Sequence, residues 1–204
     1  MNINISSIRF SSDVNGPGRR IVIWVQGCTL NCKGCFNEEQ IPHIPKNIIN
    51  TEVFYNLVKK LLIKYNCEGI TFSGGEPLQQ SKAVYDIIQR VKNDNYSIVL
   101  FTGYTIQEIE NDFNPHIINI LEHIDILISG RFKQNNPSYS RTWFDNPDKQ
   151  IRFLSDRYKQ INYDNVLNLE FNFNSDDLYY TGFLSKDDLS YLRELFEEED
   201  VLLL

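Results

Sequence analysis

A chain of 204 residues is long enough to bury a full hydrophobic core, and we expect it to form one domain. Its formal net charge of −7 argues against non-specific binding to nucleic acid, which needs a basic surface, so we expect no nucleic-acid partner. No stretch reaches the ~18 uninterrupted apolar residues of a membrane span, so we expect no membrane partner. No basic segment followed by an apolar one opens the chain, and we therefore expect a cytoplasmic location.

Short apolar runs alternate with longer amphipathic segments along most of the chain. This pattern is typical of β–α units around a mainly parallel sheet. Buried strands are predicted at residues 21–25, 69–72, 97–101, 125–129 and 151–154. Helices are predicted at residues 51–65, 79–92, 105–111 and 115–121, with Thr51 as the N-cap of the first.

The pattern changes after residue 157. Apolar and polar residues alternate over 166–173, turn residues follow at 174–177, and a second strand is expected at 178–183. A final helix is expected to begin near residue 185. We interpret this hairpin and helix as an extension at about 158–204, appended to a core at about 4–157 within one domain, and expect its strands to lie beside the parallel ones.

Three cysteines follow the first buried strand with the spacing Cys28-x3-Cys32-x2-Cys35. Three thiolates on one loop cannot complete a tetrahedral site alone. On a cubane iron–sulfur cluster, however, they leave one iron free to bind a substrate. Gly27 and Gly34 supply the conformational freedom that such a tight loop needs. The spacing therefore favours a cluster.

The alternative is a zinc site closed by His43 or Cys67. Zinc ligands usually come in pairs such as C-x2-C, and a three-then-two spacing without a clear fourth partner fits that pattern poorly. Cys67 stands apart at the end of a predicted helix, and we interpret it as a half-buried structural thiol.

A second loop, Ser73-Gly74-Gly75-Glu76-Pro77, follows the predicted strand at 69–72. Taken alone, it is also compatible with a simple strand-to-helix turn. Taken together, the cysteine and glycine loops resemble those of the radical S-adenosylmethionine (SAM) superfamily. We expect an open, partial βα barrel of the type found in that superfamily, because five strands alternating with helices cannot close a full eight-unit barrel in this length.

Five further segments narrow the resemblance to the activating enzymes of glycyl-radical enzymes. They are residues 15–19, 24–28, 34–37, 101–104 and 125–132. Within this group the chain is most similar to the anaerobic ribonucleotide reductase activases, over residues 4 to about 154.

The resemblance implies that Cys28, Cys32 and Cys35 hold three irons of a [4Fe-4S] cluster, whose fourth iron binds the amino and carboxylate groups of SAM. It also implies that Gly74 and Gly75 let the backbone approach the methionyl end of SAM. In addition, Glu76 would accept a charge-assisted hydrogen bond from its ammonium group.

Thr102, at the end of a predicted strand, is a candidate contact for the SAM ribose, since ligands gather at the carboxyl ends of parallel strands. Gly103 beside it would allow close approach. Arg131 and Lys133 are candidates for neutralising the SAM carboxylate, and equally for a solvated positive face. No catalytic residue is assigned beyond the cluster and SAM ligands.

The implied reaction begins when an external donor such as flavodoxin or ferredoxin reduces the cluster. SAM is then cleaved to methionine and a 5′-deoxyadenosyl radical, which abstracts hydrogen. The expected partner is a glycyl-radical enzyme such as anaerobic ribonucleotide reductase. A non-catalytic metal-binding module is a further hypothesis for this chain, and the glycine loop argues against it.

The alternative partner is a small molecule or peptide, modified by a stand-alone radical SAM enzyme. Two features point to it: the C-terminal extension, and residues 141–150, where only Asn146 and Gln150 resemble the activase pattern. The aromatic residues Tyr139, Trp143 and Phe144 of the long loop are expected either to cover the core or to contact substrate.

Overall fold

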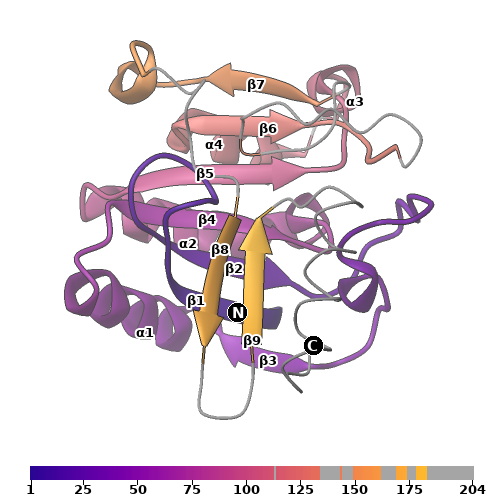
Figure 1. The fold of residues 1–204 in the computed structure, drawn as a ribbon. Coiled ribbons are helices and arrows are strands. Elements are labelled where there is room, and N and C mark those ends of the chain that lie inside the picture. The colour runs from indigo at the N-terminus through magenta and orange to yellow at the C-terminus, as the bar shows by residue number, and fades with distance from the viewer. Residues whose placement is uncertain (113, 134–142, 144–148, 162–168, 174–177, 183–204) are drawn as a thin grey trace.

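The computed structural model describes residues 1–112, 114–133, 143, 149–161, 169–173 and 178–182. Within them the main sheet has seven strands in the order β3-β1-β2-β4-β5-β6-β7 (Figure 1). The four central strands run parallel: β2 (Arg20–Val25), β4 (Gly69–Gly74), β5 (Ser97–Thr102) and β6 (Ile126–Ser129). The outer strands pair antiparallel: β1 (Asn2–Ser12), β3 (Asn47–Asn50) and β7 (Gln150–Phe153).

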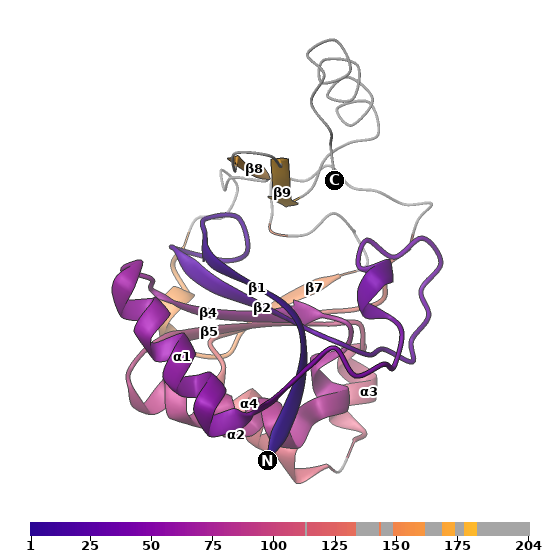
Figure 2. The same ribbon diagram turned by 90° about the horizontal axis from the view of Figure 1, so that it is seen from below.

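The helices cover one face of this sheet (Figure 2). They are α1 (Thr51–Lys64), α2 (Ser81–Asn93), α3 (Ile106–Glu110) and α4 (Pro115–His123). Three short 3-10 turns lie in the connections: η1 (Glu38–Gln40), η2 (Pro77–Gln80) and η3 (Asp156–Tyr158). The side chain of Asn50 accepts from the backbone N–H groups of Glu52 and Val53 and caps α1. The predicted cap, Thr51, was therefore one residue too late.

Two apolar clusters lie on opposite faces of the sheet. On β5, Ile98 and Leu100 belong to the main core beneath the helices. Val99 alternates with them along the strand and belongs to a smaller cluster with Trp143 and Tyr158. Trp143, predicted either to cover the core or to contact substrate, is 1% exposed and packs in this smaller cluster.

The C-terminal strands β8 (Leu169–Phe173) and β9 (Leu178–Gly182) pair antiparallel in a sheet of their own. They lie over the face of the main sheet opposite the helices (Figures 1 and 2). The Asp13 N–H donates to Glu170 at 2.9 Å, and the Asn15 amide donates to Thr181 at 3.1 Å. The expectation that this hairpin extends the main sheet was wrong, because β1 and β7 already flank the parallel strands. The predicted final helix lies outside the described residues.

Within the described part of the chain, every helix is too short or too polar to cross a membrane.

Candidate active site at the carboxyl ends of the parallel strands

A cavity of about 1280 Å³ opens at the carboxyl ends of the parallel strands and continues over the helix-free face of the sheet. The cysteine and glycine loops contribute Cys28, Cys32, Cys35, Gly74, Gly75 and Glu76 to its wall. Thr102 and Gly103 line it from the end of β5, and Lys149 lines it from just before β7. All the predicted site residues except Arg131 and Lys133 thus lie around one cavity.

The cysteine loop leaves β2 and is held at its base by backbone hydrogen bonds. Gly27 N–H donates to the Gln40 carbonyl at 2.8 Å, and Cys28 N–H donates to the Ile41 carbonyl at 3.0 Å. Gly27 and Gly34 have φ angles of +102° and +67°, as expected of the tight turns in this loop.

Burial raises the pKa values of the Cys28 and Cys35 thiols. Against this effect, the Leu30 N–H donates to the Cys28 sulfur at 3.4 Å. A metal ligand must be a thiolate, so binding of a metal group at these sulfurs would release protons.

The glycine loop packs directly on the base of the cysteine loop. A Cβ on Gly75 would lie 2.4 Å from the Gly27 carbonyl oxygen, and one on Gly74 would lie 2.5 Å from the Val25 nitrogen. The Glu76 N–H also donates to the Gly27 carbonyl at 2.9 Å. In this structure both glycines are therefore required by the close approach of the two loops.

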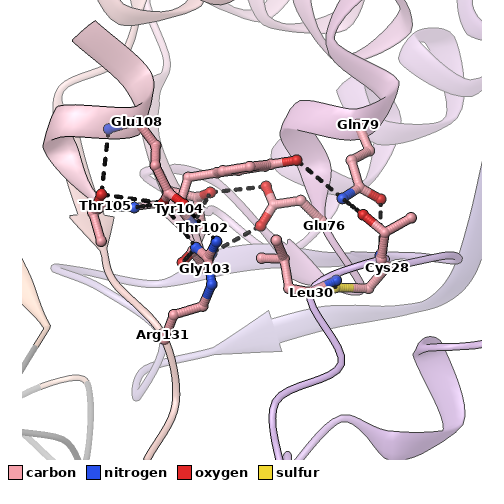
Figure 3. Close-up of polar contacts among 11 residues, drawn as sticks. Cys28, Leu30, Glu76, Gln79, Thr102, Gly103, Tyr104, Thr105, Glu108 and Arg131 are labelled. Atoms are coloured by element: carbon pink, nitrogen blue, oxygen red, sulfur yellow. Dashed lines mark hydrogen bonds and ion pairs between the residues drawn. The ribbon is translucent and has the colours of Figure 1, made fainter. Parts of the chain in front are cut away.

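The Glu76 carboxylate is fully buried and links the glycine loop to the end of β5 (Figure 3). Its Oε1 accepts from the Thr102 hydroxyl at 2.8 Å and from the Leu78 N–H at 2.9 Å. Its Oε2 accepts from the Gly103 N–H at 2.8 Å. Burial raises the pKa of Glu76, and these hydrogen bonds oppose that rise. Thr102 thus holds Glu76 in place, and its contact with the SAM ribose stays a prediction.

Gln79 links the cysteine loop to the loop after β5 (Figure 3). Its amide nitrogen donates to the Thr29 hydroxyl at 2.6 Å and to the Tyr104 hydroxyl at 3.1 Å, and its oxygen accepts from the Thr29 N–H. This role could not be predicted, because a single glutamine in a short turn belongs to no recognisable motif.

Arg131 is absent from the residues described as lining the cavity. Its guanidinium forms a two-point ion pair with Glu108, at 2.7 and 3.0 Å, and donates to the Gly103 carbonyl. It also lies 5.3 Å from the centre of the Tyr104 ring. In this structure Arg131 ties β6 to α3, and its predicted contact with the SAM carboxylate stays a prediction.

Neither residue considered for closing a zinc site lines this cavity. Cys67 lies before β4, whereas Cys28 follows β2, which is parallel to β4 and in register with it. About six residues of strand, roughly 20 Å, therefore separate Cys67 from the cysteine loop. Cys67 is 6% exposed and belongs to the main core, as a structural thiol should. His43 packs against Gly27 outside the cavity wall.

The donor set fits an iron–sulfur cluster. Three partly buried, unpaired thiols face a cavity large enough for a cluster and a further ligand. Among the described Cys, His, Asp and Glu side chains, no three converge on one ion position. A cubane cluster takes its three thiolates on three different irons.

The fold and this thiol loop define an α/β iron–sulfur protein. Residues 14–151 match the sequence profile of the 4Fe-4S single cluster domain family, and the chain belongs to that family.

The chain is also similar to several anaerobic ribonucleoside-triphosphate reductase-activating proteins. It is 31% identical to the Vibrio cholerae protein over 135 residues, which is 64% of this chain and 84% of that protein. It is 33% identical to the Enterobacteria phage T4 protein over 133 residues, covering 61% of this chain and 78% of the relative. The Escherichia coli K12 protein is 26% identical over 151 residues, covering 69% and 92%. These findings confirm the resemblance to activating proteins.

The solved structure of QueE from Escherichia coli is also similar to this chain. The alignment covers 52% of this chain and 54% of the QueE chain, at 16% sequence identity and a TM-score of 0.41. This likeness is too weak to support an argument.

Proposed function

We propose that this protein is a radical SAM enzyme that activates a glycyl-radical enzyme of the anaerobic ribonucleotide reductase type. The observation that supports it best is the meeting of the cysteine and glycine loops on one cavity wall. The curated relatives, which carry the name of reductase-activating proteins and which this chain matches over most of their length, support the choice of partner.

In this proposal Cys28, Cys32 and Cys35 hold a [4Fe-4S] cluster. When bound, the cluster supplies the electron for reductive cleavage of SAM. The chain's own residues position the ligand and exclude water. Gln79 fixes the cysteine loop against the loop after β5, and Thr102 fixes the Glu76 carboxylate at the cavity wall.

The Glu76 carboxylate is suited to bind the ammonium group of the methionyl moiety. Its Oε2 accepts a single hydrogen bond from the described residues, whereas a carboxylate oxygen can accept two. The same cavity wall includes the aromatic ring of Phe36, which packs edge-on against Phe132 with ring centres 4.9 Å apart. Such apolar walls lower the local dielectric and limit access of water to a reactive ligand.

We further propose that residues 1–204 form one unit, with a partial βα barrel at about 4–157 and the extension at about 158–204. An external donor of the flavodoxin or ferredoxin class would deliver the electron. A cytoplasmic location suits three clustered thiols that must stay reduced until they bind iron.

A stand-alone enzyme acting on a small molecule or peptide is the second candidate. It is supported by the extension, which lies beyond the matched residues 14–151 and yet contributes Thr181 and Gly182 to the cavity wall. An extra wall restricts what can enter the site.

The test is to mix the reduced, SAM-loaded protein anaerobically with an anaerobic ribonucleotide reductase. A glycyl-radical doublet in the electron paramagnetic resonance spectrum is expected, and Cys32→Ala should give none. Absence of a protein radical, together with deuterium transfer from a small molecule or peptide into 5′-deoxyadenosine, would replace the activase by the second candidate.

A further inference from the structure

Lys149 places an ammonium group at the cavity wall, beside the candidate ligands. It directly precedes β7, whose Gln150 pairs with Ser129 at the end of β6. Its Nζ donates to the Gly130 carbonyl at 3.0 Å, which fixes the ammonium at the carboxyl ends of the parallel strands. Lys149 lines the same cavity as Cys32, Cys35 and Glu76.

The charge of Lys149 has no anion paired with it among the described side chains. Gly130 is its single acceptor there, so two of the three ammonium N–H donors are unused. Burial lowers the pKa of Lys149, and attraction to the ionised forms of Glu76, Cys32 and Cys35 opposes that effect. A partly buried cation without an ion-pair partner is costly unless an anionic ligand completes its environment.

The other cations near the cavity are less suited to such a ligand. Among the described residues that line the cavity, Arg9 is the other cation, and it lies on β1 opposite Val22, well before the carboxyl end of β2. Arg131 is engaged by Glu108 outside the wall.

We propose that the Lys149 ammonium binds the carboxylate of the methionyl moiety of SAM. The methionyl moiety carries one positive and one negative group, and the cavity wall offers the complementary pair, the Glu76 carboxylate and the Lys149 ammonium. This inference rests on the proposed function only in that the cavity binds SAM, and it does not depend on the partner protein.

The test compares two ligands that differ by this carboxylate, SAM and decarboxylated SAM. Their equilibrium dissociation constants are measured anaerobically on the oxidised, cluster-loaded protein and on Lys149→Met. Lys149→Met should bind SAM about ten- to a hundredfold more weakly, the range for loss of a hydrogen bond between charged groups. It should bind decarboxylated SAM within about twofold of wild type, because that ligand offers Lys149 nothing to bind.

Two further variants and the iron content control for indirect effects. Lys82→Met makes the same change on the exposed face of α2 and should leave both affinities unchanged. Lys149→Arg keeps the charge and should retain most of the preference for SAM over decarboxylated SAM. If Lys149→Met fails to hold a cluster, Lys149→Arg still tests the inference, because loss of that preference would contradict it. Iron and sulfide per chain should match wild type in each variant compared.

Equal weakening of both ligands by Lys149→Met would overturn the inference, as would unchanged SAM binding. A selective loss of SAM binding in Arg131→Met but not in Lys149→Met would return the role to Arg131. If wild type binds neither ligand, the proposed function fails. If wild type binds SAM and Lys149→Met binds it equally well, only this inference fails.

Discussion

Thr102→Val tests whether Thr102 anchors Glu76. The Thr102 side chain is 2% exposed, donates to the Glu76 carboxylate at 2.8 Å and accepts from the Tyr104 N–H at 3.1 Å. Valine keeps the shape of threonine but removes the hydroxyl. The hydrogen bond to a charged acceptor is worth about 1.5–3 kcal/mol, and leaving the part-buried Tyr104 N–H without its acceptor costs about 1 kcal/mol more. We therefore expect the free energy of unfolding to fall by about 2.5–4 kcal/mol.

The assay is urea denaturation of the cluster-free protein at pH 7. The midpoint should shift to lower urea with an unchanged slope, which marks a change in stability alone. Thr29→Val is the matched control. The Thr29 hydroxyl also forms a side-chain hydrogen bond, but it lies on the exposed loop, so a loss of about 0.5 kcal/mol is expected.

The outcome separates two roles for Thr102. A residue that only contacts the SAM ribose would leave the stability of the ligand-free protein unchanged. If Thr102→Val loses no more stability than Thr29→Val, the anchoring argument is refuted.

Three other predictions test the remaining structural arguments. Cys32→Ala should lose the iron–sulfur absorbance. Cys67→Ala should keep this absorbance and hold about four irons per chain. Stoichiometric zinc in place of iron would contradict this assignment. Gly75→Ala should lower the melting temperature, because its Cβ would meet a backbone oxygen of the cysteine loop at 2.4 Å; an unchanged melting temperature would contradict this packing. For Asp125→Asn we expect a loss of about 2–3 kcal/mol at pH 7. Burial disfavours ionisation of Asp125, but its contacts, chiefly with the Lys92 ammonium at 2.8 Å, hold its pKa below the ordinary 3.8. The stabilisation is therefore complete above that value and is lost as the pH falls from it through the lower pKa of the folded state. A gap between variant and wild type that stays constant from pH 7 down to about pH 2 would argue against the pair.

The central strands were predictable because they are buried on both faces. Such strands appear as short continuous apolar runs, and the predicted 21–25, 69–72, 97–101 and 125–129 lie within two residues of the observed ends. β1 was missed although it contains alternating isoleucines. Its register against β2 shifts between Ile5 and Ser7, and such an irregularity breaks the alternation that marks a strand. β3 was missed because it is a short, exposed edge strand.

The cysteine and glycine loops were found because their chemistry is local in sequence. The hydrogen bonds from Thr102 and Gly103 to Glu76 were not predicted, since these residues reach Glu76 only through the pairing of β4 with β5. Lys149 carries no local signal at all. It is a lysine after a long polar loop, and only the antiparallel return of β7 beside β6 brings it to the cavity.

The hydrogen bonds that hold the cysteine loop have a consequence for maturation. The loop is fastened by the protein's own backbone, through Gly27 to Gln40, Cys28 to Ile41 and Glu76 to Gly27. In a zinc finger the metal itself drives folding, so loss of the metal unfolds the domain. Here the three thiols are presented by a loop that the surrounding chain already shapes. Cluster insertion can thus follow folding. If oxygen destroys the cluster, iron and sulfide can be delivered again to the folded protein, which does not have to unfold first.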